Sequence, residues 1–186
     1  MYCVQHSIHS FLISAGLTEV FTHPQERQIV NGPPLTTLPV LGVQWSVAFK
    51  IKLSNFAGYS HCLNLIGESS EVINIMLTSG NKFRLMFGYP FLKSSTNKID
   101  DDTSMSLGVW TQIEIAQVQQ GSTTNIIFMK NGNIVGTLEN THPHNIFGVN
   151  VFAVKTGVNP QPGTIKELTI RTDLSGNDTS QNTNHQ

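Results

Sequence analysis

Three consecutive aspartates, Asp100, Asp101 and Asp102, form the only acidic cluster in the sequence. They lie in the long polar stretch Tyr89–Leu107, which Pro90 interrupts and which we interpret as a loop, or as a loop with a short edge strand. Carboxylate oxygens on a flexible loop are ligands of the kind that Ca²⁺ prefers. The alternative is a solvated acidic loop, because adjacent side chains face one ion only in a tight turn. A calcium site at the three aspartates is therefore a hypothesis, and no other cofactor is expected.

Aromatic and amide side chains in the same region are of the type that binds sugars. Sugar sites combine planar polar groups, which take hydroxyls, with an aromatic surface for the apolar face of the ring. The chain is rich in Asn and Gln, and several of its aromatic residues flank polar loops. The ligand-binding candidates are Tyr59, Tyr89, Phe91 and Asn97. Packing in the core is the alternative role for the aromatic members.

Catalytic patterns are absent from the sequence. Retaining glycoside hydrolysis needs two carboxylates about 5–5.5 Å apart, but Glu68 and Glu71 flank a turn and Glu114 stands alone, which predicts a solvated strand residue. There is no G-x-S-x-G nucleophile motif. Cys62 follows His61, and adjacent strand residues point to opposite faces of a sheet, so the two cannot act as nucleophile and base. We therefore expect a protein that is not an enzyme, with no catalytic residues.

Histidine and cysteine do not form a recognisable metal motif. His142 and His144 flank a proline, but a zinc site needs three or four ligands, so a surface histidine pair is expected. There are two cysteines, Cys3 and Cys62. They form either a disulfide or two free or buried thiols, and the sequence leaves both open.

The composition excludes several classes of partner. Of the 186 residues, 39% are hydrophobic and only 12% charged, and the formal net charge is −1. Without a basic run, no electrostatic argument favours nucleic acid or an anionic membrane. No apolar run approaches the roughly 20 residues of a membrane span. The uncharged polar surface is typical of extracellular all-β domains, so a secreted protein is expected.

The chain divides into one domain and two flanking segments. Residues 1–19 are a degenerate secretion signal or an edge strand, with a weak apolar run from Ile8 to Leu17. Residues 20–174 are expected to form a single domain, and residues 175–186 a disordered polar tail. That tail contains a glycosylation sequon at Asn177, which would be used only in a secreted protein.

Alternation of apolar and polar residues predicts an all-β domain. In Val43–Leu53 every second residue is apolar, which is typical of a strand with one buried face. Gly108–Glu139 reads as three antiparallel strands joined by a polar turn and by the Asn131-Gly132 pair, which is typical of a type I′ turn. About ten or eleven short strands are expected. Two packed antiparallel sheets bury such surfaces best, and a closed barrel is the alternative.

The same residues resemble a known superfamily. G-x-W-T-x-I-E-I from Gly108, K-N-G-x-I-V from Lys130 and G-T-I-K-E-L-T-I from Gly163 are similar to the laminin-G-like and pentraxin-like branch of the concanavalin A-like lectin/glucanase superfamily. The resemblance covers roughly residues 29–172. It implies an antiparallel two-sheet β-sandwich of jelly-roll type, in which Trp45 and Trp110 fill the core. The E-x-D-x-x-E string of the superfamily's glucanases is missing.

The resemblance implies a recognition module rather than a specific ligand. We expect a non-catalytic extracellular, lectin-like domain that binds carbohydrate or a glycosylated partner, with self-association into a homo-oligomer left open. Fold alone is a weak argument for function. The alternatives are an adhesion or structural domain that binds another protein without a small ligand, and an intracellular SPRY-like interaction domain.

Overall fold

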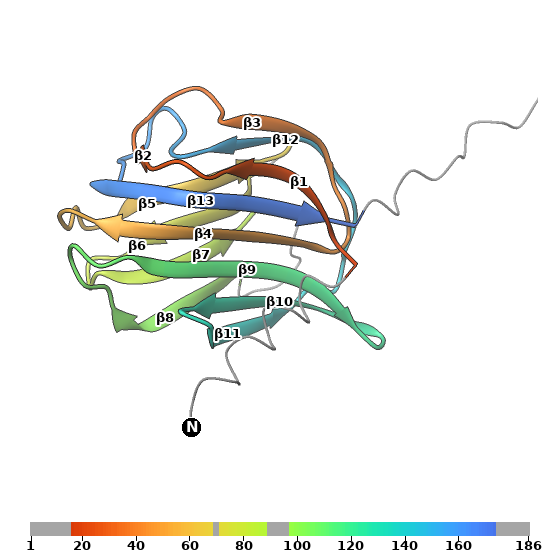
Figure 1. The fold of residues 1–186 in the computed structure, drawn as a ribbon. Coiled ribbons are helices and arrows are strands. Elements are labelled where there is room, and N and C mark those ends of the chain that lie inside the picture. Colours follow the sequence, from red (N-terminus) through yellow and green to blue (C-terminus); the bar gives the residue numbers. More distant parts are fainter. Residues whose placement is uncertain (1–15, 69–70, 89–96, 174–186) are drawn as a thin grey trace, which may run out of the picture.

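A computed structural model describes residues 16–68, 71–88 and 97–173. These residues form two antiparallel sheets packed face to face, and thirteen strands occur among them (Figure 1). The seven-stranded sheet comprises, in spatial order, β1 (Thr18–His23), β13 (Gly163–Thr172), β4 (Trp45–Leu53), β9 (Thr111–Gln120), β10 (Thr123–Lys130) and β11 (Asn133–Glu139), with β2 (Arg27–Gln28) also paired to β13. The six-stranded sheet comprises, in spatial order, β3 (Thr36–Leu41), β12 (Ile146–Phe152), β5 (Ser60–Ile66), β6 (Glu71–Leu77), β7 (Lys82–Phe87) and β8 (Lys98–Ser104). The predicted all-β sandwich is confirmed.

The core lies between the sheets and follows the predicted alternation. On β4, Trp45, Phe49 and Ile51 are at most 1% exposed, and the residues between them face outward. Phe128 of β10 contacts Phe83 of β7 edge to face, with ring centroids 6.2 Å apart. This contact joins the two sheets, because each strand contributes one apolar side to the same core.

Two turns form as their residues predict. Asn131 and Gly132 have φ angles of 50° and 78°, the positive pair that a type I′ turn requires. Asn81 has a φ of 58° in the turn that connects β6 to β7. The second turn places β7 beside β6, and β7 then pairs with β8.

The edges of the two sheets meet beside β8. Residues 98–104 form an edge strand, which confirms the interpretation of Tyr89–Leu107 as a loop with a short edge strand. Lys130 of β10 points inward and donates hydrogen bonds to the carboxylate of Asp101 on β8. Asp101 is 3% exposed and also accepts hydrogen bonds from the backbone and the hydroxyl of Thr103, both at 2.8 Å. A buried ion pair therefore connects the two sheets.

Two expectations about single residues are wrong. Trp110 does not fill the core: it is half-buried just before β9, and the ammonium groups of Lys52 and Lys166 each lie 4.5 Å from the centroid of its ring. Glu114 is not solvated, since only 6% of it is exposed although it faces outward from β9. Strand alternation sets the direction of a side chain but does not show what covers it.

Several sequence predictions lie outside the described residues. They concern most of the N-terminal segment, Cys3, the aromatic candidates Tyr89 and Phe91, and the tail with Asn177. Within the described ranges, Cys62 is buried and has no disulfide partner, and burial raises the pKa of its thiol. The described residues contain no helix that is long and apolar enough to cross a membrane.

Candidate functional site

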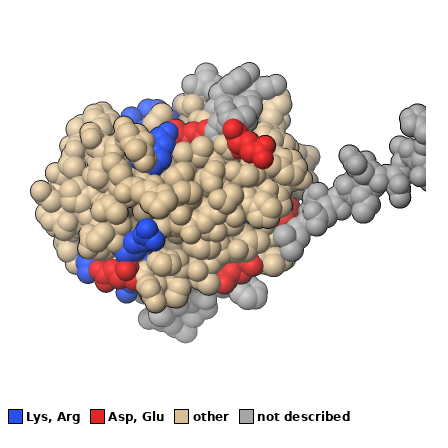
Figure 2. Space-filling model, turned by 90° about the horizontal axis from the view of Figure 1, so that it is seen from above, with Lys and Arg blue, Asp and Glu red and all other residues tan. Residues whose placement is uncertain are grey.

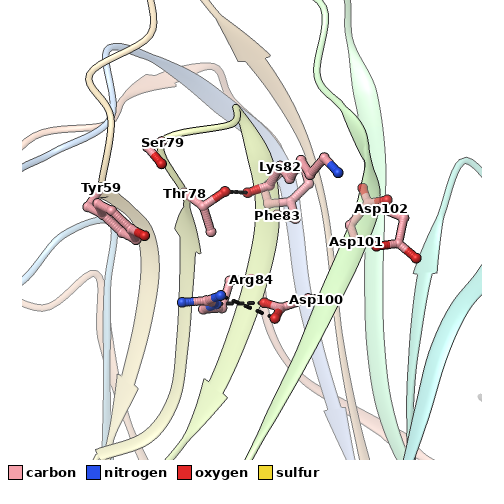
Figure 3. Close-up of a pocket in the computed structure, with 9 residues that line it drawn as sticks. All are labelled: Tyr59, Thr78, Ser79, Lys82, Phe83, Arg84, Asp100, Asp101 and Asp102. Atoms are coloured by element: carbon pink, nitrogen blue, oxygen red, sulfur yellow. Dashed lines mark hydrogen bonds and ion pairs between the residues drawn. The ribbon is translucent and has the colours of Figure 1, made fainter.

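An open polar pocket lies on the outer side of the six-stranded sheet, at the end where β6 turns into β7 (Figure 3). Its volume is about 270 Å³. Arg84 and Asp100 point toward each other in its centre, and Tyr59 lies to one side of them (Figure 3). The lining residues are Tyr59, Thr78, Ser79, Lys82, Phe83, Arg84, Asp100, Asp101 and Asp102.

The arginine–aspartate pair is built by the register of β7 and β8. Arg84 stands directly opposite Asp100, so both side chains leave the same face of the sheet. The guanidinium donates two parallel hydrogen bonds, Nε to Oδ1 at 2.5 Å and Nη2 to Oδ2 at 3.1 Å. Lys98 Nζ lies 3.0 Å from Oδ2 of the same carboxylate. Such a bidentate pair is planar and holds its direction better than a flexible ion pair.

The pair keeps both partners charged. The hydrogen bond from Arg84 holds the pKa of Asp100 below its usual value, and Lys98 acts in the same direction. The hydrogen bond to Asp100 in turn raises the pKa of Arg84. The pocket therefore offers a fixed carboxylate and a fixed guanidinium at neutral pH, with 38% and 25% of the respective side chains exposed.

Tyr59 is held in place by a buried hydrogen-bond network behind it. The next residue, Ser60, is fully buried and donates its hydroxyl hydrogen bond to Gln161 Oε1 at 2.5 Å. Gln161 Nε2 donates to the backbone carbonyl of Asn55, so both ends of the turn before β5 are fixed. The ring of Tyr59 projects from this turn and is 57% exposed. An exposed aromatic ring on an ordered turn is a rigid contact surface.

The three aspartates do not converge on one point. Asp101 turns inward to Lys130, whereas Asp100 leaves the opposite face of β8 and pairs with Arg84. One ion therefore cannot take ligands from all three, and this geometry does not fit the calcium hypothesis. Across residues 16–68, 71–88 and 97–173, no three His, Cys, Asp or Glu side chains are grouped so that they could hold a metal ion.

The other described candidates have structural roles. Asn97 donates from Nδ2 to the carbonyl of Phe87 at 2.9 Å, which fastens the start of β8 to the end of β7 rather than lining the pocket. His142 and His144 are exposed in a loop, as predicted. Of the four ligand-binding candidates, the structure thus places Tyr59 in the pocket, together with all three aspartates.

Sequence reasoning missed Arg84, Lys82 and the hydroxyls of Thr78 and Ser79. Arg84 interrupts the apolar alternation Phe83, Leu85, Phe87 as an outward residue, and that pattern alone assigns it to the solvent side. Its partner is 16 residues away, and only the pairing of β7 with β8 brings them together. The one available signal was the presence of oppositely charged residues on consecutive strands.

Charged residues elsewhere on the surface are sparse and mixed. Figure 2 shows positive and negative side chains in small separate groups on one face, with large uncharged areas between them. Several lie in exposed ion pairs, such as Lys50 with Glu167 at 2.7 Å. This arrangement provides no extended basic surface on the face shown.

Comparison with known proteins places the fold but not the function. No protein-family model matches the sequence, and no curated protein sequence is significantly similar to it. Among solved structures, it is similar to the native heptameric SAP-like pentraxin from Limulus polyphemus, with 18% identity, a TM-score of 0.55, and coverage of 80% of this chain and 74% of the pentraxin chain.

Two further solved structures have the same fold. The CBM40 of the Ruminococcus gnavus IT-sialidase, bound to α2,3-sialyllactose, is 15% identical with a TM-score of 0.55, covering 83% of this chain and 88% of the module. Domains LG4-5 of the mouse laminin α1 chain are 14% identical with a TM-score of 0.53, covering 81% of this chain and 44% of the laminin chain. The fold is thus a concanavalin A-like β-sandwich, as the sequence resemblance implies.

Proposed function

We propose that this protein is a carbohydrate-binding module whose pocket beside Tyr59 holds a sugar unit of a glycan. The observation that carries the proposal is the exposed tyrosine ring next to the bidentate Arg84–Asp100 pair in an open polar pocket. A cavity of about 270 Å³ is close to the small end of ligand pockets and suits one polar unit rather than an extended apolar molecule.

The chemistry of the lining suits a polyhydroxylated ligand. The Asp100 carboxylate accepts hydrogen bonds from hydroxyl groups, and the free N–H groups of Arg84 donate to ring and hydroxyl oxygens. Thr78 and Ser79 add hydroxyls, which both donate and accept. Tyr59 offers an apolar ring face for the C–H side of the sugar. These groups stay in place before binding, which reduces the entropy lost on association.

One similar structure supports the choice of ligand class. The Ruminococcus gnavus module, which this chain covers to 88%, is a carbohydrate-binding module in complex with a sialylated sugar. Its identity of 15% makes this support for the fold's suitability only. The identity of the sugar for this protein follows from its own pocket.

The proposed activity is binding without catalysis. A glycosidase acid needs a raised pKa so that it is protonated at neutral pH, whereas the hydrogen bond from Arg84 lowers the pKa of Asp100. The carboxylate in the centre of the pocket is therefore a hydrogen-bond acceptor and not a proton donor. An extracellular location, which would expose the protein to glycans, remains part of the proposal and draws on the low share of charged residues, 12%.

A glycan array tests the proposal. The unmodified protein is expected to bind a limited set of glycans, and Tyr59→Ala to lose at least about tenfold in affinity, since one well-placed aromatic contact contributes roughly 1.4 kcal/mol or more. The matched control is Phe147→Ala, because Phe147 is also an aromatic residue with 57% exposure but lies on β12, away from the pocket. A blank array, or equal losses in both variants, would contradict the proposal.

A protein-binding domain is the second candidate function. Leu107 and Val109 are 45% and 54% exposed and precede the half-buried Trp110, so apolar groups gather at that end of the seven-stranded sheet. Exposed apolar groups of this kind occur in protein interfaces. A blank glycan array together with a saturable protein partner would favour this second candidate.

A further inference from the structure

A second apolar cluster lies on the outward side of the seven-stranded sheet, separate from the core. Its members belong to β9 and β10, and each alternates with a residue that faces the core. They are Ala116, Val118, Ile127 and Met129. Each is at most 9% exposed. Outward positions on a two-layer sandwich face solvent unless something lies over them, so burial to this degree requires a cover.

The described strands do not provide that cover. The six-stranded sheet packs on the opposite side, and no described segment crosses in front of β9 and β10 in Figure 1. The outward Glu114 is also buried, at 6% exposure, and stands opposite Met129 in the β9–β10 register. Carboxylates are rarely buried at the surface of a sheet without a further layer above them.

Small residues beside the cluster form a shallow trough. Ser46 of β4 lies opposite Ala116, and Ala48 lies opposite Glu114. Ser46 is 1% exposed, and its hydroxyl has no hydrogen-bond partner among the described residues. Buried hydroxyls are nearly always paired. A peptide backbone crossing the trough would supply that partner, and the short side chains leave room for it.

We propose that residues 1–15 of this chain lie across the trough and form a third layer over β9 and β10. The segment MYCVQHSIHSFLISA contains no Asp, Glu, Lys or Arg. It carries Ile8, Phe11, Leu12 and Ile13. An uncharged segment with this many apolar side chains matches an apolar surface and gains free energy by leaving water.

The chain is long enough and starts at the correct end of the sheet. Residue 18 begins β1 opposite Thr172, and the register continues through Trp45 to Gln117 beside the cluster. From β1 to β10 there are four strand steps, roughly 19 Å at about 4.8 Å per step. Fifteen extended residues reach roughly 50 Å, so the segment crosses the trough with residues to spare.

Methionine oxidation tests the proposal on the full chain. Met129 is 1% exposed, Met86 on the other sheet is 36% exposed, and Met105 is a 6% exposed core residue. With dilute hydrogen peroxide and peptide mass spectrometry, the intact chain should oxidise quickly at Met86 and slowly at Met129 and Met105. Deleting residues 2–15 is expected to raise the rate at Met129 by about tenfold or more, because oxidation follows exposure, and to leave Met105 protected.

A deletion of residues 175–186 is the matched control, since it removes a polar tail of similar length from the other terminus. It should leave Met129 protected. If the N-terminal deletion does not fold, Phe11→Asp with Ile13→Asp in the full chain replaces it, with Ser10→Asp and Ser14→Asp as the charge-matched control. Met129 that stays protected in a folded, monomeric deletion variant, or that oxidises as quickly as Met86 in the intact chain, overturns the proposal.

Discussion

Replacing Lys130 with methionine is expected to lower the free energy of unfolding by about 3 kcal/mol or more, because removing one partner strands a buried charge. The carboxylate of Asp101 is 3% exposed and relies on Lys130 and Thr103 for its hydrogen bonds. Urea unfolding followed by tryptophan fluorescence measures the change, since Trp45 is fully buried in the core. The effect should be large because the pair joins β8 of one sheet to β10 of the other.

Two further variants separate the stranded charge from lost packing. In Lys98→Met the lost partner is 43% exposed, so the cost should stay below about 1 kcal/mol. The double variant Lys130→Met with Asp101→Leu removes both charges and should recover most of the lost stability. If Lys130→Met costs no more than Lys98→Met, the buried pair does not stabilise the contact between the sheets.

Replacing Phe128 with alanine is expected to lower the free energy of unfolding by about 3–5 kcal/mol, the range for removing a buried phenylalanine. Phe128 is fully buried, and its ring meets Phe83 at an interplanar angle of 84°. The substitution removes both the transfer free energy of the ring and its contact with the opposite sheet. A thermal or chemical unfolding curve gives the difference directly.

The exposed Phe147 provides the control for this substitution. It is 57% exposed, so Phe147→Ala should change stability by no more than about 0.5 kcal/mol. A double-mutant cycle with Phe83→Leu and Phe128→Leu should give a coupling of about 0.5–1.5 kcal/mol for the edge-to-face pair. A loss below about 1 kcal/mol for Phe128→Ala would contradict the arrangement of the core.

Local patterns predicted the second half of the fold well. β13 begins and ends at the predicted residues, Gly163 and Thr172, because a glycine opens a clear alternation there. The Asn131-Gly132 turn was readable because few residue pairs accept two positive φ angles. β1, β2 and β3 were not predicted as separate strands, since β1 and β3 are partly exposed and β2 has only two residues.

The site was less predictable because it depends on pairing between strands. Tyr59 and the aspartates were identified by residue type, but Arg84 becomes part of the pocket only through the register of β7 with β8. Trp110 and Glu114 were misassigned for a related reason. Alternation gives the direction of a side chain, whereas its burial depends on what lies above that face of the sheet.

The central claim is that a glycan binds on the outer side of the six-stranded sheet beside Tyr59 and Arg84. A two-dimensional NMR titration of the isotope-labelled protein with the strongest ligand from the array tests it most directly. The expected result is saturable shift changes gathered at Tyr59, Thr78, Ser79, Arg84 and Asp100, and their loss in Arg84→Ala. Shift changes gathered instead around Trp110 and Lys52 on the seven-stranded sheet would contradict the account.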